Sequence, residues 1–292
     1  MTQDPTTVAE DLNDLIGFVD ASPTPYHAVA TAAALLDHAG FTALDPIEDW
    51  GPEAAGPAYV VRDGALVAWC PGRRSDPAAP LRMIGAHTDS PGLRLKPRAA
   101  HAADGLLRLG VEVYGGPILA TFADRDLSLA GRVSVRQDGG HATRLLHFEQ
   151  PLVRLPNLAI HMNREVNEQG LKFNKQTELP LLFGAAAGTA DADAAFRRHL
   201  AAALAVESGD VLTWELNAYD TQKGSFWGAD GEFVAARQLD NLASCHAALS
   251  ALLACREPEA TCVCALFDHE EVGSESASGR SDGRTDNGCR SN

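Results

Sequence analysis

Apolar residues recur at helical spacing in four stretches of the chain. This periodicity predicts helices over residues 8–22, 27–39, 191–206 and 237–257. The second helix is expected to end at Gly40, because glycine readily adopts the left-handed conformation that closes a helix. Helical segments therefore lie near both ends of the chain and once in its middle.

Short apolar runs predict strands beside these helices. Residues 58–69 alternate around Asp63 and Gly64, a pair that is typical of a hairpin turn. Residues 81–86 form an apolar strand that ends just before His87, and residues 261–267 form another. Because strands and helices alternate at both ends of the sequence, these parts indicate an α/β fold.

The pattern changes after residue 97. Between residues 98 and 236, apolar and polar residues mostly alternate and are punctuated by glycines, which predicts short antiparallel strands. One of these strands is expected over residues 142–155 and another over 211–222. We interpret the block as a β-rich insertion in an α/β domain.

Four segments follow from this interpretation. Residues 1–97 are the first part of the α/β domain, 98–236 the insertion, and 237–279 the second part of the α/β domain. Residues 280–292 form a polar tail that lacks periodicity and cannot pack as a core element.

Composition narrows the classes of protein that fit. The 292 residues are 45% hydrophobic, which suffices for one large domain or two modest ones. A net charge of −15 argues against nucleic acid and anionic membranes as partners. No run approaches the ~18 apolar residues of a membrane span, and the N-terminus lacks a signal-peptide core. The six cysteines contain no CxxC pair, so we expect a reducing cytoplasmic location.

Three polar clusters could carry chemistry. They are His-Thr-Asp-Ser at 87–90, Leu-Asp-Asn at 239–241 and Asp-His-Glu-Glu at 268–271. Two of them follow predicted strands, where ligands gather in α/β sheets, and the third starts a predicted helix. Imidazole and carboxylates together suit a divalent metal of zinc type. Each cluster also has a simpler explanation: a local hydrogen bond at 87–90, a helix cap at 239–241 and solvated surface at 268–271.

Other hydrolase and nucleotide-binding motifs are absent from the sequence. A second histidine four residues after His269 would complete HExxH, but Gly273 stands there, and neither GxSxG nor a glycine-rich phosphate loop occurs. In an extended loop, Glu270 and Glu271 would point in opposite directions. One could then bind a metal ion while the other accepts a proton from water.

Longer motifs resemble the M18 family of metallo-aminopeptidases, in particular its aspartyl aminopeptidase group. The matching stretches run in the family's order from about residue 10 to Gly279. They are GAHTDSPGLRLKP, YGGPILATFADRDLSLAGRV, LPNLAIHMNREVNEQG, QTELPLL, RQLDNLASC and FDHEEVGSESASG.

The resemblance implies a fold and a function. It implies a phosphorylase-like α/β catalytic domain with an inserted β-rich domain that drives assembly into dimers and then a dodecamer. It also implies a two-zinc aminopeptidase that releases N-terminal residues from peptides, Asp or Glu in this group. An aminopeptidase for neutral residues is the alternative within the class.

The resemblance also implies roles for individual residues. His87 and Glu271 would each bind a zinc ion, and Asp240 would bridge the two ions. Asp89 would orient His87, and Glu270 would be the general base.

A sixth residue is assigned to the neighbouring subunit. His161, in the stretch NLAIHMN, would reach into the active site of that subunit and contact its substrate. Without the resemblance, a histidine packed on a strand is the simpler interpretation of His161.

The family pattern implies further residues after Gly279. It includes an aspartate and a final histidine ligand, which residues 280–292 do not supply. We therefore expect a C-terminally truncated chain whose tail is translated out of frame. The alternative function is that of a catalytically inactive fragment that retains only self-association.

Overall fold

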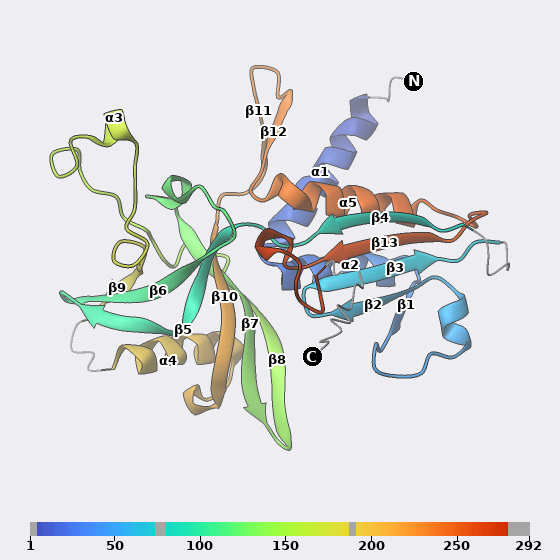
Figure 1. Ribbon diagram of the computed structural model, residues 1–292, viewed down its shortest axis with the longest axis horizontal. Coiled ribbons are helices and arrows are strands. Elements are labelled where there is room, and N and C mark those ends of the chain that lie inside the picture. The colour runs from blue at the N-terminus through green and yellow to red at the C-terminus, as the bar shows by residue number, and fades with distance from the viewer. Residues whose placement is uncertain (1–4, 74–79, 187–190, 280–292) are drawn as a thin grey trace, which may run out of the picture. The chain divides into compact units, whose positions relative to one another are not determined.

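The computed structural model describes residues 5–73, 80–186 and 191–279 (Figure 1). The chain forms two compact units. The first unit comprises Met1–His27 and Ser90–Leu239, and the second comprises Ala28–Asp89 and Asp240–Asn292. The chain therefore passes between the units three times, and each unit is built from segments that are distant in sequence.

An antiparallel sheet of six strands forms the centre of the first unit (Figure 1). Its order is β8-β7-β10-β5-β6-β9, and every neighbouring pair is antiparallel. The strands are β5 (Gly92–Ala103), β6 (Leu106–Tyr114), β7 (Leu127–Gln137), β8 (Gly140–His147), β9 (Leu181–Ala185) and β10 (Val211–Asp220).

Helix α4 (Ala192–Leu204) packs on this sheet. Asp191 caps its N-terminus by accepting a hydrogen bond from the backbone N–H of Ala194 at 2.9 Å. Phe196 and Leu200 of the helix are fully buried, and the Phe196 ring meets the edge of Trp214 from β10. The core of the first unit therefore lies between α4 and the sheet.

Smaller elements complete the first unit. They are α1 (Pro5–Ala21), η2 (Leu119–Phe122), α3 (Val166–Gln169), η3 (Ser208–Asp210), β11 (Ser225–Trp227) and β12 (Phe233–Ala235). Helix α2 (Pro25–His38) begins in the first unit and continues into the second.

A mixed sheet of five strands forms the centre of the second unit, in the order β1-β2-β3-β13-β4. Strand β13 pairs parallel with β4 and antiparallel with β3. The elements of this unit are β1 (Thr42–Leu44), η1 (Pro52–Ala55), β2 (Ala58–Arg62), β3 (Ala65–Cys70), β4 (Arg82–His87), α5 (Leu239–Leu253), β13 (Cys262–Phe267) and η4 (Glu270–Val272).

Strand β4 is an edge of this sheet in the described part of the chain. Leu81, just before it, is 60% exposed, and Met83 and Ile84 within it are 64% and 49% exposed. Successive side chains of a strand point to opposite faces, so apolar groups are exposed on both sides of β4. This composition is typical of a strand inside a parallel sheet rather than at its edge.

Most of the expected elements are confirmed. The four predicted helices correspond to α1, α2, α4 and α5, and the α/β fold class is confirmed. The hairpin of β2 and β3 turns at Asp63, whose φ is 54°. The tail, residues 280–292, lies outside the described residues.

One strand expectation is wrong in part. The strand expected over residues 142–155 ends at His147 with β8, and only isolated bridges follow at Val153–Leu155. Pro151 lies between them and has no N–H to donate, so it cannot continue the ladder of hydrogen bonds. No helix among the described residues is long and apolar enough to cross a membrane.

Candidate metal centre

Two neighbouring strands bring the main polar clusters together. His87 is the last residue of β4 and pairs in register with Phe267, the last residue of β13. Because these strands are parallel, their carboxyl ends lie side by side, and the segments that follow them leave the sheet at the same end. Asp89 lies on one segment, and Glu270 and Glu271 lie on the other.

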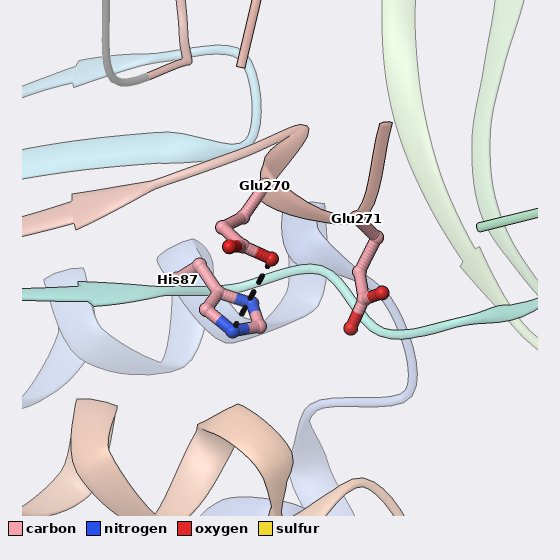
Figure 2. A group of neighbouring side chains, drawn as sticks. All are labelled: His87, Glu270 and Glu271. Carbon is pink, nitrogen blue, oxygen red and sulfur yellow. Dashed lines mark ion pairs between the residues drawn. The ribbon is translucent and has the colours of Figure 1, made fainter. Parts of the chain in front are cut away.

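The ligand atoms of three side chains converge in this region. One nitrogen of His87 and one carboxylate oxygen from each of Glu270 and Glu271 all lie within 4.8 Å of one another. Figure 2 shows the Glu270 carboxylate beside the imidazole of His87, and its Oε2 is 3.9 Å from Nε2 of His87. Asp240 Oδ1 is 3.4 Å from the same nitrogen. Three of the expected site residues, Asp240, Glu270 and Glu271, therefore lie around the imidazole of a fourth, His87.

Asp89 is fully buried and contacts three residues of this arrangement. Its Oδ1 accepts a hydrogen bond from the backbone N–H of Glu270 at 3.2 Å, and its Oδ2 accepts one from Glu271 at 3.1 Å. Oδ1 also lies 3.4 Å from Nδ1 of His87. One carboxylate therefore positions the imidazole and both glutamate backbones.

Charges in this cluster shift two pKa values. The pKa of His87 is raised to about 9, chiefly by its hydrogen bond with Asp89, although burial opposes the rise. The pKa of Glu271 is raised by burial and by the neighbouring carboxylates, Asp89 first among them. An imidazole nitrogen binds a metal ion only after it has lost its proton. Protons and metal ions therefore compete for His87.

Asp240 is not part of a regular helical turn. Its backbone lies at φ −86° and ψ 108°, Asn241 is also non-helical, and the peptide bond between them is cis. Regular α5 geometry begins only after Asn241. The Asp240 side chain is 87% exposed, so a ligand could reach it.

The expectation for the two glutamates is wrong in one respect. They do not lie in an extended loop that separates their side chains but in the 3-10 turn η4, between His269 at φ 65° and Gly273 at φ 98°. Both carboxylates therefore come near His87. The turn is braced by the backbone N–H of Ser274, which donates to the carbonyl of His269 at 2.7 Å.

Sequence analysis missed one residue that contacts the backbone of this site. The thiol of Cys245, on α5, donates a hydrogen bond to the carbonyl oxygen of His87 at 3.0 Å. It stands five residues after Asp240, so its helical position placed it near the cluster, but a buried cysteine gives no clear signal of such a role.

His161 belongs to the first unit, whereas the other five expected site residues all belong to the second unit. It lies in an exposed turn between Leu155 and α3. It is therefore not packed on a strand, which was the simpler interpretation of this residue.

A family model matches most of this chain. The model described as "Aminopeptidase I zinc metalloprotease (M18)" matches residues 18–287. The chain belongs to the M18 family. Membership confirms the resemblance found in the motifs and fits a cluster of imidazole and carboxylate groups.

Several M18 proteins are similar to this chain. "Probable M18 family aminopeptidase 2" of Pseudomonas fluorescens strain SBW25 is 49% identical over 276 residues, which are 92% of this chain and 63% of the relative. The chain therefore spans less than two thirds of the length of this relative.

Solved structures agree with the fold. A chain in the cryo-EM structure of the Ape4 and Nbr1 complex has a TM-score of 0.88 and 34% identity, covering 96% of this chain and 58% of that one. The mApe1 dodecamer of S. cerevisiae has a TM-score of 0.78 and 25% identity, covering 94% of this chain and 64% of that one.

Proposed function

We propose that this chain has the function of a zinc-dependent aminopeptidase, which releases N-terminal residues, Asp or Glu, from peptides. The observation that carries the proposal is the convergence of Asp240, Glu270 and Glu271 on His87, in a chain of the M18 family. The similar Pseudomonas fluorescens protein is named an aminopeptidase, which supports the same activity.

The residues of the cluster fit zinc. One imidazole and several carboxylates, close together at the ends of strands, are ligands that zinc accepts. We assign His87, Asp240 and Glu271 as the residues that would hold zinc. When bound, zinc polarises the scissile carbonyl and lowers the pKa of a water molecule toward ~7.

The chain's own groups would move and hold the reacting atoms. Glu270 accepts the proton of the attacking water and returns it to the leaving amine. Its side chain is 55% exposed, which leaves room for a water molecule and a peptide beside it. Asp89 does not touch the substrate but keeps His87 and the η4 turn in place.

Self-association is the second part of the proposal. We assign it to the β-rich segment 98–236, and the S. cerevisiae relative whose title names a dodecamer supports it. His161 would then contact substrate in the site of a neighbouring copy. Cytoplasmic location is supported by the free thiols of the described cysteines.

Zinc content and hydrolysis together test the proposal. We expect bound zinc after dialysis and turnover of peptides with N-terminal Asp or Glu above those with neutral residues. Glu270→Gln should lower kcat by at least about 100-fold while zinc is retained. Glu275→Gln, an exposed glutamate outside the cluster, is the matched control and should leave kcat unchanged.

Two other outcomes would overturn parts of this assignment. Near-zero zinc and no turnover, with self-association intact, would favour the alternative of an inactive fragment. Turnover that prefers neutral residues would replace the acidic specificity with the neutral one. The exposed apolar side chains of the edge strand β4 are the observation that favours the alternative of an inactive fragment.

A further inference from the structure

Three cysteines from separate elements of the second unit converge where β13 begins. Cys262, the first residue of β13, lies directly opposite Cys70, the last residue of β3. Cys255 follows the end of α5, and its carbonyl oxygen accepts a hydrogen bond from the thiol of Cys70 at 3.6 Å. All three are free thiols. The group lies at the opposite end of β13 from η4, so it is separate from the candidate metal centre (Figure 1).

The three thiols differ in exposure and in their partners. Cys70 is buried, and its thiol is directed at a backbone carbonyl. Cys255 and Cys262 are only half-buried, and the Cys262 thiol is one of the neighbouring groups that raise the pKa of Cys255. The thiol of Cys262 also donates to the carbonyl of Ala260 at 3.6 Å. The two more exposed thiols therefore neighbour the same buried cysteine and are within reach of solvent.

Arg82 gives this pair a charged neighbour. Burial, the hydrogen bond with Cys262 and the nearby thiols raise the pKa of Cys255, and the positive charge of Arg82 works against that rise. Arg82 pairs in register with Cys262 across β4 and β13. A thiolate that forms at this position therefore has a cation close to it.

We propose that Cys255 and Cys262 are a dithiol–disulfide pair that small disulfides of the glutathione type oxidise, while the buried Cys70 stays reduced. This is a modification site that is independent of the proposed peptidase activity. Oxidation would tie the end of α5 to the start of β13 across residues 256–261. In a reducing compartment such a bond is transient and follows the redox state of the small-thiol pool.

The chemistry balances in two exchange steps. The thiol of Cys255 loses its proton to water, and the thiolate attacks one sulfur of the small disulfide, whose S–S bond breaks and releases one thiolate. The thiolate of Cys262 then attacks the sulfur of Cys255 and expels the second small thiolate. The two protein thiols lose two electrons, and the small disulfide gains them as two small thiols.

Mass spectrometry of the full chain tests the proposal. The protein is equilibrated in graded mixtures of reduced and oxidised glutathione, quenched in acid and alkylated with N-ethylmaleimide after denaturation. We expect the alkylated species to lose two maleimide groups in one step as the mixture becomes oxidising. Because Cys289 lies outside the described residues, Cys289→Ser is the reference chain for the titration.

Peptide mapping identifies the two sulfurs. Trypsin cleaves after Arg256, so the bond should appear as two cross-linked peptides, and fragmentation should place it between Cys255 and Cys262. Cys255→Ser and Cys262→Ser should each abolish the linked species. Cys70→Ser is the matched control and should leave it unchanged.

Two results would overturn the proposal. One is full alkylation of every thiol even when glutathione is almost wholly oxidised. The other is a bond between Cys70 and Cys262, which would show that the cross-strand pair reacts instead. The reference chain itself reveals either result, so the conclusion does not depend on the variants folding.

Discussion

The two units differ in the side chains that an edge strand of each sheet exposes. In the first unit, the edge strand β8 carries His141, Thr143 and Arg144, which protect it with polar and charged groups. In the second unit, the edge strand β4 exposes Met83 and Ile84. Edge strands of soluble proteins usually resemble β8, because apolar edges pair with other chains.

The difference bears on the candidate metal centre. His87 terminates the exposed strand β4, whereas the first unit has a core enclosed between its sheet and α4. We infer that the first unit owes its stability mostly to apolar burial. The arrangement around His87 depends more on charge and on the hydrogen bonds of Asp89.

The largest expected effect is in the core of the first unit. Phe196→Ala removes a fully buried ring that meets Trp214, with ring centroids 5.3 Å apart. Loss of burial and the cavity left behind should lower the free energy of unfolding by about 3–5 kcal/mol, measured by urea denaturation. Ile118→Ala, at an exposed position of the same unit, is the control. Equal effects of the two variants would show that α4 does not enclose a packed core.

The pH dependence of stability should have opposite signs in the two units. His27 of the first unit is buried beside His147, and burial lowers its pKa to about 4, so its neutral form stabilises the fold. That stability is present above pH 6.5 and is lost as the pH falls toward 4. The folded pKa of His87 is instead about 9, so its contribution is full below pH 6.5 and is lost as the pH rises through 9.

Each of these contributions is on the order of 3 kcal/mol. We would measure unfolding of the zinc-free chain across this pH range for the unaltered protein, His27→Gln and His87→Gln. The first variant should flatten the acid limb alone and the second the alkaline limb alone. A single limb that responds to both variants would contradict the comparison.

Asp89→Asn should affect the second unit through its ligands. The amide keeps the volume of the carboxylate but cannot accept hydrogen bonds at both terminal atoms, so His87 and the η4 turn lose part of their support. Loss of such support should weaken zinc binding about 10–100-fold, measured by competition with a chelator. Glu259→Gln, exposed in the same unit, is the control. Unchanged affinity would remove Asp89 from the positioning role.

Local pattern was enough to predict the helices and most strands, because their periodicity and turn residues act over a few positions. It also marked the polar clusters around His87 and Glu270. It could not show that β4 and β13 are parallel neighbours, since the residues between them include most of the first unit. The convergence of both glutamates depends on the left-handed backbone at His269, which no apolar pattern encodes. The same applies to Asp240, whose backbone departs from the helix that the periodicity predicts.

The smallest effect on stability is expected at the exposed edge itself. Met83→Lys adds a charge to β4 and should change the free energy of unfolding by no more than ~0.5 kcal/mol. It should nevertheless reduce concentration-dependent aggregation, measured by light scattering, because a lysine on an edge opposes pairing with another chain. Leu145→Lys, on the already polar edge strand β8, should change aggregation little. If both lysines act equally, net charge and not the apolar edge of β4 controls aggregation, and the contrast between the two sheets has no consequence in solution.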